Sequence, residues 1–445
     1  MWSLTQSMGS LLSIRQEHVI ETYTTIPEAE HGIKLDELCP HATDIVRDLQ
    51  EAGYESYIVG GSVRDMLLGK LPKDFDVATS ATPEEVQDVF PRCRLIGRRF
   101  RLAHVRKGGA LIEVATFRGQ APVDQGSDQR AGRILRDNVF GTVEEDALRR
   151  DFTINALFLD PVSGLVRDYT GGYQDLAERR LRLIGDPQTR YREDPVRLLR
   201  AARFVAKLGV EPDQETLAPM KELSTLLGDI PSARLFEEVC KLLLTGHGKR
   251  SMEALQRFGL SAILFPALKK VSGAGKIHIG PVLSKALDNT DDRLRESKPV
   301  TPAFLFAAIL WQPVKERAAA LTAAGETEYN AMMQASEEVI SAQVGRTALP
   351  RRFSAVTRQI WTMQVRLQKT RGKRWQRPLN ERRFRAAYDF LLLRAEEDPS
   401  LTELCEFWTK AQEGIDFSRK AHESRNRPRG KYRRRARGRP RTGRP

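Results

Sequence analysis

Two aspartates separated by one residue, Asp74 and Asp76, are the side chains best placed for chemistry in this sequence. They stand in the run Asp74-Phe75-Asp76-Val77, whose alternation of polar and apolar residues predicts a strand with both carboxylates on one face. Two neighbouring carboxylates repel each other unless a cation lies between them. Mg²⁺ prefers oxygen ligands and substrate phosphates, so the pair predicts a magnesium site that handles phosphate chemistry.

The residues just before this pair predict a place for a phosphate. Residues 57–59 form a short apolar run typical of a strand, which ends at Gly60 and Gly61. Without Cβ atoms, these glycines let backbone N–H groups approach a phosphate closely. A helix is expected to follow, with Ser62 as its N-cap and Arg64 in its first turn. Gly60, Gly61 and Arg64 are therefore the expected phosphate-binding residues.

The order of these two motifs resembles that of a known enzyme family. The chain carries GGSVRDMLLG followed within a few residues by DFDV, which is similar to the signature of the nucleotidyltransferase branch that holds class II tRNA nucleotidyltransferases and bacterial poly(A) polymerases. The resemblance implies nucleotidyl transfer with two Mg²⁺ ions and makes Asp74 and Asp76 the metal ligands. One ion would activate the 3′ oxygen of an RNA, and the other would neutralise the charge of the leaving pyrophosphate. A third carboxylate would come from Glu113, in a strand expected over residues 110–117, or from Asp151.

A second motif of the same family is RRDFTINAL, residues 149–157. By resemblance, Arg150 approaches the nucleotide and Asp151 lies at the site. A helical cluster of salt bridges is the purely structural explanation for these charges. Residues 168–172, DYTGG, match a third family element, a turn that links the head to a helical neck.

Residues 190–209 predict an amphipathic helix with chemistry on its polar side. Asp194 and Arg197 can match the donor and acceptor edge of adenine, and that of cytosine equally well. Guanine and uracil present an oxygen where the aspartate needs a donor. The segment resembles the family's protein template for the incoming base, with Arg200 and Arg203 at positions that contact the triphosphate. An ordinary surface helix would show the same apolar stripe.

Later segments look like bacterial poly(A) polymerases over most of the chain, among them DIPSARLFEE and PAFLFAAILW. The implied activity is template-independent addition of AMP from ATP to RNA 3′ ends, as in 3′ polyadenylation, RNA processing and decay. A CCA-adding tRNA nucleotidyltransferase is the alternative, because the base-reading pair tolerates cytosine. A non-catalytic RNA-binding protein is the second alternative. No His-Asp dipeptide occurs, so the phosphohydrolase domain appended to some tRNA nucleotidyltransferases is not expected.

Positive charge gathers toward the C-terminus and predicts contact with RNA. Residues 419–445 hold thirteen Lys or Arg against one acid, and residues 366–385 hold nine against one. In the second segment Trp375 and Phe384 interleave with the cations, so bases could stack on the rings while phosphates meet the charges. Residues 419–445 could instead be a tail that only keeps the protein soluble, and residues 366–385 could be a pair of helices that face water. The expected RNA-binding residues are Lys369, Arg371, Lys373, Arg374, Arg433, Arg434 and Arg435.

The chain of 445 residues is long enough for two or three domains. We expect an α+β fold with a small mixed α/β nucleotidyltransferase head, an all-helical neck and body, and a disordered basic tail. The expected segments are an irregular N-terminus 1–34, the head 35–160, the neck with the template helix 161–255, the RNA-binding body 256–417 and the tail 418–445. Scattered cysteines and the absence of a long apolar run favour a cytoplasmic protein, and we expect it to be a monomer. Its partners would be single-stranded RNA 3′ ends and RNA-decay or RNA-chaperone proteins.

Overall fold

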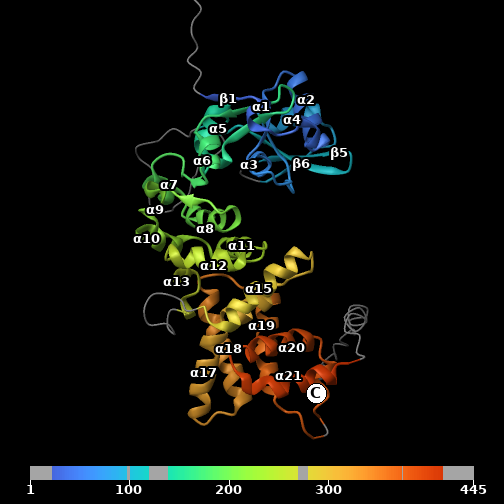
Figure 1. The fold of residues 1–445 in the computed structure, drawn as a ribbon, viewed down its shortest axis with the longest axis vertical. Coiled ribbons are helices and arrows are strands. Elements are labelled where there is room, and N and C mark those ends of the chain that lie inside the picture. The colour runs from blue at the N-terminus through green and yellow to red at the C-terminus, as the bar shows by residue number, and fades with distance from the viewer. Residues whose placement is uncertain (1–22, 98–100, 120–138, 269–278, 373, 414–445) are drawn as a thin grey trace, which may run out of the picture. The chain divides into compact units, whose positions relative to one another are not determined.

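The computed structural model describes residues 23–97, 101–119, 139–268, 279–372 and 374–413 (Figure 1). The chain divides into two compact units, Met1–Asp229 and Ile230–Pro445. All strands of the described residues belong to the first unit, and the described part of the second is helical, so the α+β class is confirmed. The expected tail, residues 418–445, lies outside the described residues.

The first unit is built on an eight-stranded mixed sheet. Its strands are β1 Thr24–Ile26, β2 Ser56–Val59, β3 Asp76–Thr79, β4 Arg94–Ile96, β5 Leu102–Lys107, β6 Ala110–Thr116, β7 Leu157–Asp160 and β8 Leu165–Asp168. Their spatial order is β1-β8-β7-β2-β3-β6-β5-β4. Neighbouring strands are antiparallel, except that β3 and β6 run parallel. The aspartate-bearing strand β3 therefore lies in the middle of the sheet, between β2 and β6.

The predicted strand, glycine turn and helix are present, with two local corrections. The strand β3 begins at Asp76, so Asp74 precedes it instead of lying within it. Ser62 is not the N-cap of α3 Gly61–Leu67, because the cap is Gly60. The Ser62 hydroxyl donates instead to the carbonyl of Val59, at 3.1 Å. Gly60 has a φ of +73°, a conformation that side chains with a Cβ rarely adopt.

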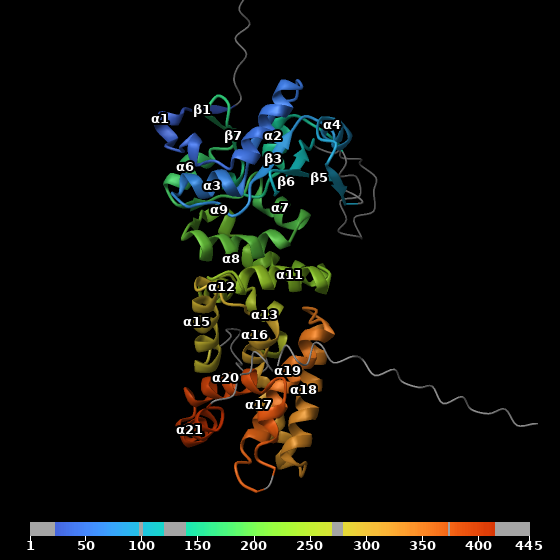
Figure 2. The same ribbon diagram turned by 90° about the vertical axis from the view of Figure 1, so that its right-hand side faces the viewer.

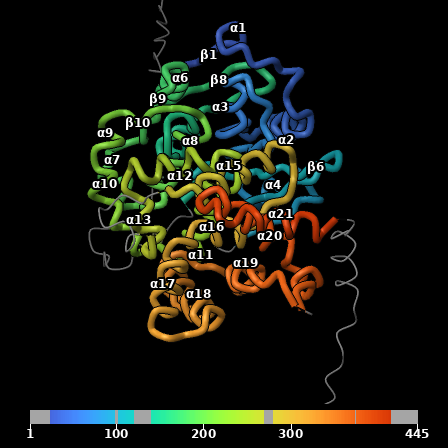
Figure 3. The backbone as a smooth tube through the Cα atoms, turned by 60° about the horizontal axis from the view of Figure 1, so that its bottom comes forward, coloured from blue at the N-terminus to red at the C-terminus, as the bar shows by residue number. Residues whose placement is uncertain are grey.

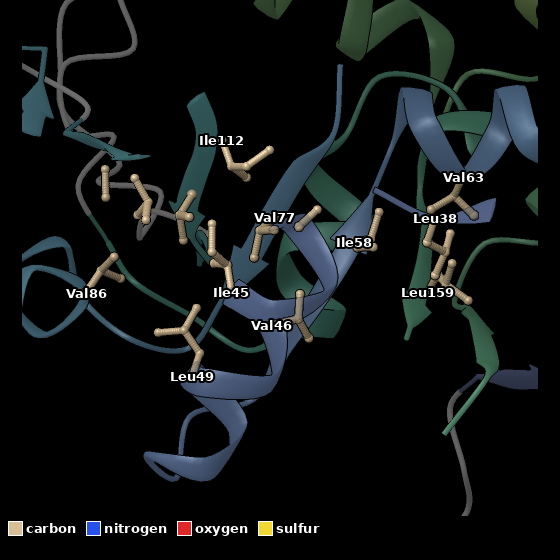
Figure 4. Packing of buried hydrophobic residues seen from close by; sticks show 14 of the residues in the cluster. Leu38, Ile45, Val46, Leu49, Ile58, Val63, Val77, Val86, Ile112 and Leu159 are labelled. Atoms are coloured by element: carbon tan, nitrogen blue, oxygen red, sulfur yellow. The ribbon is translucent and has the colours of Figure 1, made fainter. Parts of the chain in front are cut away.

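One face of the sheet is covered by α2 Pro40–Glu51 (Figure 2). The helix buries residues at helical spacing and directs them at the central strands. The side chains that meet in this core (Figure 4) include Ile45, Val46, Leu49, Ile58, Val77 and Ile112. This packing fixes the register of the strands, because a slip by one residue would turn every apolar side chain to the other face.

The opposite face carries a second core, to which α5 Val143–Arg149 and the residue Ala156 contribute. Residues of β2 alternate between the two cores, with Ile58 in the first and Val59 in the second. Asp76 is the register partner of Val59 and therefore belongs to the second face. The first unit is completed by α1 Glu28–His31, η1 Leu35–Glu37, α4 Pro83–Val89, η3 Thr153–Asn155, α6 Gly172–Ala177, β9 Arg180–Leu181, α7 Pro187–Glu193, α8 Val196–Leu208, β10 Glu211–Pro212, α9 Gln214–Leu217, α10 Met220–Leu223 and η4 Ser224–Asp229.

The second unit is a set of packed helices. They are α11 Ser232–Leu243, α12 Gly248–Arg257, α13 Ser261–Leu264, α15 Pro281–Arg295, α16 Pro302–Ile309, α17 Trp311–Ala323, α18 Glu328–Val344, α19 Arg351–Leu367, η5 Arg377–Asn380, α20 Phe384–Ala395, η6 Pro399–Leu401 and α21 Thr402–Ala411. Figure 3 shows α17 and α18 side by side as a helical hairpin. The segment PAFLFAAILW forms α16 and the start of α17, and nearly all of it is buried. Among the helices of the described residues, none has the length and apolar character needed to cross a membrane.

Candidate active site

Three carboxylates gather at one end of β3. Asp76 is the register partner of Glu113 on β6, and Asp74 lies two residues ahead of Asp76. Partial desolvation raises the pKa of Asp76, and the like charges of Glu113 and Asp74 also raise it, whereas Arg150 acts in the opposite direction. Asp74 and Glu113 therefore both lie within electrostatic reach of Asp76.

This arrangement fits a cation that substrate phosphates help to bind. Within the described residues, no group of three or more His, Cys, Asp or Glu side chains is arranged to hold a metal ion by itself. Mg²⁺ usually takes one or two carboxylates and fills its other positions with water and phosphate oxygens. The like-charge repulsion at Asp76 is the kind that such an ion relieves.

His104 on β5 is a neighbour of this cluster that sequence reasoning missed. It is the register partner of Glu113, and its Nε2 lies 3.4 Å from Glu113 Oε1. The available signal was the hairpin that the sequence predicts from strands over residues 92–105 and 110–117, because the position of His104 depends on the pairing of β5 with β6.

Arg150 supplies positive charge beside the carboxylates. Its Nε and Nη2 donate to Asp146 Oδ2 at 3.1 and 2.9 Å, and its Nη1 donates to the carbonyl of Asn155 at 3.2 Å. The guanidinium lies over the ring of Phe158, 4.8 Å from the ring centroid. A Cβ on Gly60 would stand 3.2 Å from Arg150 Nη1, so the glycine leaves the room that the guanidinium occupies.

The two glycines differ in what they offer to a phosphate. The N–H of Gly60 donates to the carbonyl of Leu157 at 3.2 Å, so this amide is already used within the sheet. Gly61 is the first residue of α3, and a Cβ there would make only an ordinary contact of 3.5 Å with Arg64. Gly60 is therefore needed for its backbone conformation and for the space that Arg150 occupies. Gly61, at the start of α3, is the glycine that a phosphate could approach.

Arg64 lies on the expected helix, α3, and its guanidinium is bonded to protein groups. It is buried, with 4% of its surface exposed. Its Nη1 donates to Asn155 Oδ1 at 2.5 Å, and its Nε and Nη2 donate to Asp65 Oδ1 at 2.9 and 2.6 Å. In this structure Arg64 therefore connects α3 to η3 and does not open toward a phosphate.

Asp151 is held by three hydrogen bonds at the junction of α5 and η3. Its Oδ1 accepts from the backbone N–H of Phe152 at 2.9 Å and from Asn155 Nδ2 at 3.0 Å, and its Oδ2 accepts from Arg200 Nε at 2.5 Å. Burial alone would raise the pKa of Asp151, but the charge of Arg200 and these hydrogen bonds outweigh burial and lower it. Asp151 therefore holds α8 through Arg200, and Glu113 is the carboxylate placed beside Asp76.

Besides its contact with Asp151, α8 makes a contact with α3. Lys207 Nζ donates to Asp65 Oδ2 at 3.1 Å, so α8 is attached through Arg200 near its first turn and through Lys207 near its end. Asn155 joins the two attachments, because its side chain bonds both Arg64 and Asp151. Sequence reasoning missed Asn155, Asp65 and Lys207, although Asn155 belongs to the quoted motif RRDFTINAL.

The expected base-reading residues lie where α7 gives way to α8. Asp194 is the C-cap of α7, and its Oδ1 accepts from the N–H of Val196 at 3.2 Å. Arg197 Nη1 donates to the carbonyl of Arg190 at 2.6 Å and to Glu193 Oε2 at 2.9 Å. A guanidinium has five N–H donors, and these contacts use one nitrogen.

Two further arginines of α8 were expected to meet the triphosphate. Arg200 and Arg203 are half-buried, and their guanidinium carbons lie 5.5 and 5.2 Å from the centroid of the buried ring of Phe204. Arg64 approaches the same ring at 5.3 Å. Three cations thus gather around one aromatic side chain, which concentrates positive charge on this part of the first unit.

The turn DYTGG, residues 168–172, is held by hydrogen bonds to the side chain of Asp168. The buried carboxylate of Asp168 accepts backbone N–H bonds from Thr170, Gly171, Gly172 and Tyr173 at 2.8 to 3.0 Å. A Cβ on Gly172 would lie 2.1 Å from the carbonyl oxygen of Thr153. The turn therefore lets α6 pack directly against η3, the segment that carries Asn155.

The predicted RNA-binding segment of the second unit has exposed cations, one half-buried ring and one buried ring. Lys369, Arg371 and Arg374 are exposed, whereas Lys373 and Arg433, Arg434 and Arg435 lie outside the described residues. Phe384 is fully buried, and Trp375 packs on Phe407 and Trp408 with centroids 5.2 and 6.1 Å apart. The prediction that these two rings form a stacking platform is wrong for Phe384, because the helices α20 and α21 bury it in their own core.

Sequence comparison relates most of the chain to known proteins. Residues 56–182 match the family model described as "Poly A polymerase head domain", residues 209–271 that of "Probable RNA and SrmB- binding site of polymerase A", and residues 324–442 that of "Polymerase A arginine-rich C-terminus". Poly(A) polymerase I of Salmonella typhimurium strain LT2 is 46% identical over 398 residues, which cover 87% of this chain and 86% of that protein. The CCA-adding enzyme of Bacillus pumilus is 38% identical over 222 residues, which cover 50% of this chain and 54% of that protein.

Structural comparison gives the same fold. The crystal structure of the Bacillus stearothermophilus CCA-adding enzyme in complex with CTP aligns with a TM-score of 0.55 and 24% identity, covering 88% of this chain and 90% of that one. At this identity the likeness concerns the fold alone. The identity and coverage of the Salmonella protein decide the family, and the chain belongs to the poly(A) polymerase I family of nucleotidyltransferases.

Proposed function

We propose that this chain adds AMP from ATP to the 3′ hydroxyl of RNA at the end of β3, beside Asp76. The observation that carries the proposal is the pairing of Asp76 with Glu113, with Arg150 near enough for its charge to act on the pKa of Asp76. Carboxylates and an arginine at one place suit a magnesium–triphosphate complex, in which negative charge must be both bridged and neutralised.

Asp74, Asp76 and Glu113 would hold Mg²⁺, which when bound would lower the pKa of the attacking hydroxyl and neutralise the leaving phosphates. The chain's own contribution is placement. Arg150 is fixed by Asp146 and the Asn155 carbonyl, so it can meet a phosphate without a further loss of side-chain freedom.

The remaining nucleotide contacts would come from α8 and from Asp194, the C-cap of α7. Arg200 and Arg203 would contact the triphosphate, and Asp194 with Arg197 would read the base. Asp151 would act through Arg200, which it positions at 2.5 Å. Gly61 would let the phosphate approach the start of α3, and Arg64 would stabilise that helix from within the core.

RNA would reach the site by contacts with the second unit, for which Lys369, Arg371 and Arg374 are exposed cations. Such contacts do not depend on base sequence, and they weaken with rising salt. A loose grip of this kind lets the 3′ end move after each addition. Lys373, Arg433, Arg434 and Arg435 are proposed for the same role from the sequence alone.

The test is extension of a labelled generic RNA with Mg²⁺ and each nucleoside triphosphate separately, for the wild type, Asp76→Ala and the control Asp88→Ala. Asp88 is an exposed acid on α4 outside the proposed site. A long ladder with ATP alone, kept by the control and lost by Asp76→Ala, is the expected result. Addition of a few residues confined to tRNA and needing CTP would replace the proposal with CCA addition, and no extension at all would leave a binding protein.

A further inference from the structure

A cavity of about 980 Å³ lies among α15, α16, α19 and α20 of the second unit, outside the site described above. Small-molecule and cofactor sites commonly measure about 300–1,000 Å³, so the cavity is large enough for a nucleotide. Its walls combine half-buried rings with arginines. We propose that this cavity is an accessory site for single-stranded RNA, which takes an unstacked base against its apolar wall and the adjoining phosphates on its arginines.

The apolar wall is supported from behind by the core. Phe353 of α19 lies 5.9 Å, centroid to centroid, from Phe236 of α11, and Phe304 of α16 lies 6.1 Å from Phe390 in an edge-to-face contact. Both lining rings are half-buried, and Val356 lies beside them on the cavity wall. Rings fixed in this way offer flat apolar surface at little cost in side-chain freedom, which is what base stacking needs.

The charged wall has an excess of cations without carboxylate partners. Four acids line the cavity, and each is paired: Asp389 with Arg385 at 2.9 Å, Glu396 with Lys285 at 3.9 Å, Glu296 with Lys298 at 2.5 Å, and Asp292 with Arg295. Across the described ranges, no ion pair is made by the lining residues Arg352, Arg382 and Arg383. Desolvation lowers the pKa of Arg383, and the charge of the adjacent Arg382 lowers it further.

An anionic occupant explains this wall better than a protein segment does. Two adjacent guanidiniums, one of them partly desolvated, repel each other until an anion lies between them. A phosphate accepts two N–H bonds from a guanidinium fork, and the phosphodiester backbone brings such groups together with a base. An apolar helix would cover the rings but would leave Arg382 and Arg383 without partners.

The inference rests on the proposed activity only because that activity makes RNA the substrate and the product. The residues involved are all in the second unit, and they differ from the exposed cations Lys369, Arg371 and Arg374. The site would hold a nucleotide of the strand upstream of its 3′ end, and it would thereby slow release of the RNA between additions.

The first experiment measures binding of the full chain to labelled oligoadenylate without ATP or divalent ions. Arg382→Glu and Arg383→Glu are compared with Lys410→Glu, which makes the same charge change at an exposed lysine of α21 away from the cavity. We expect binding about tenfold weaker for each cavity variant, with the slope of log affinity against log salt reduced by about 0.7 per lost phosphate contact, and wild-type behaviour for the control. Equal binding by all four proteins would overturn the proposal.

The second experiment tests the base. Val356→Trp fills the apolar wall, and Val344→Trp makes the same change at an exposed position of α18 outside the cavity. The wild type should bind oligoadenylate more tightly than an abasic strand of equal length, and Val356→Trp should bind both equally, with an unchanged salt slope. If circular dichroism shows that Val356→Trp is unfolded, Leu392→Trp on the same cavity replaces it. A wild type that binds both strands equally would show that no base enters.

A separate measurement keeps this inference distinct from the proposed catalytic activity. Asp76→Ala should bind oligoadenylate like the wild type while it fails to extend RNA. Failure of extension in the wild type with normal cavity binding would overturn the proposed function alone. If the cavity variants keep their affinity for RNA but lose the affinity for a protein ligand, the cavity is a protein-docking site and the inference is wrong.

Discussion

Asp76 and Glu113 face the same side of the sheet because they are register partners in the parallel pair of β3 and β6. This pair is the only parallel contact of the eight-stranded sheet in the described residues. Residues far apart in the sequence thereby carry like charges at one place. Their mutual repulsion works against the fold until a cation is present, which links the stability of the head to the function proposed for it.

The first expected consequence concerns Asp76→Asn in the absence of divalent ions. Because the pKa of Asp76 is raised in the fold, stability is lost as the pH rises through that pKa, and at neutral pH the charged form is unfavourable. The variant should therefore melt about 1–2 °C higher than the wild type at pH 7, a small change because the side chain is exposed. Thermal unfolding followed by circular dichroism measures it.

Addition of Mg²⁺ completes this test. The ion should raise the melting temperature of the wild type and of the control Asp88→Asn, and it should have little effect on Asp76→Asn. A variant that is less stable than the wild type, or one that responds equally to Mg²⁺, would show that the cluster does not bind the ion in the way proposed.

The ion pair of Asp151 with Arg200 leads to a second expectation. Asp151→Asn removes the charge that holds Arg200 Nε at 2.5 Å. We expect kcat/KM for ATP to fall about 10- to 100-fold, as is typical when a residue that orients a ligand-binding group is lost. Arg200→Gln alone and the double variant should show losses of similar size, because the two residues act as a unit. Fully multiplicative losses would mean that they act independently.

The same pair sets an acid limit to stability. The pKa of Asp151 is lowered from its ordinary value near 3.8, so its contribution to the free energy of unfolding is complete above that value and is lost as the pH falls through the lower pKa of the folded state. Urea unfolding should therefore show a constant difference between the wild type and Asp151→Asn from pH 5 to pH 7, and a shrinking difference below about pH 4. A difference that grows on acidification would contradict this assignment.

The sequence predicted those parts of the site that are local in the chain. Gly60, Gly61 and the two aspartates follow one another within one strand, turn, helix and strand, and the apolar stripe of α8 is readable from its helical period. The burial of Arg64 was not predictable in this way, because it depends on Asn155, which lies 91 residues away. The same holds for His104, whose place follows from strand pairing.

The second unit shows a different limit of sequence reasoning. Aromatic residues between cations are compatible both with an RNA surface and with an amphipathic helix, since period alone does not say what the rings face. Phe384 turned out to be core, whereas Phe304 and Phe353, which the sequence did not single out, line a cavity. Which ring reaches the surface is decided by how the helices pack, and this information is not local.

Gly172 gives a third expectation, based on close packing. An added Cβ would lie 2.1 Å from the carbonyl oxygen of Thr153, so the backbone of α6 or η3 must move. Gly172→Ala should destabilise the first unit by about 1–3 kcal/mol in urea unfolding, and it should also reduce activity, because η3 carries Asn155. Gly345→Ala is the control, since its nearest neighbour would be 3.8 Å away and its φ is −61°. Equal stability of the two variants would argue that η3 has room to move.

Glu193 provides a test of the base-reading pair that leaves the fold intact. Its Oε2 accepts from Nη1 of Arg190 and from Nη1 of Arg197, both at 2.9 Å, which fixes the guanidinium expected to meet the base. The Glu193 side chain is 40% exposed, so Glu193→Gln should change the free energy of unfolding by less than about 1 kcal/mol. The KM for ATP should rise about three- to tenfold with little change in kcat, because Glu193 orients Arg197 for binding of the nucleotide and takes no part in the chemical step.

The same variant should also discriminate less between ATP and CTP, since a looser Arg197 distinguishes less well between two bases that share a donor and acceptor edge. Steady-state extension of a short RNA with each nucleotide gives both constants. Glu222→Gln, at an exposed position of α10, serves as the matched control. If Glu193→Gln lowers kcat and leaves KM unchanged, then Arg197 does not bind the incoming nucleotide in its ground state, and the role of α8 must lie in phosphate contact through Arg200 and Arg203.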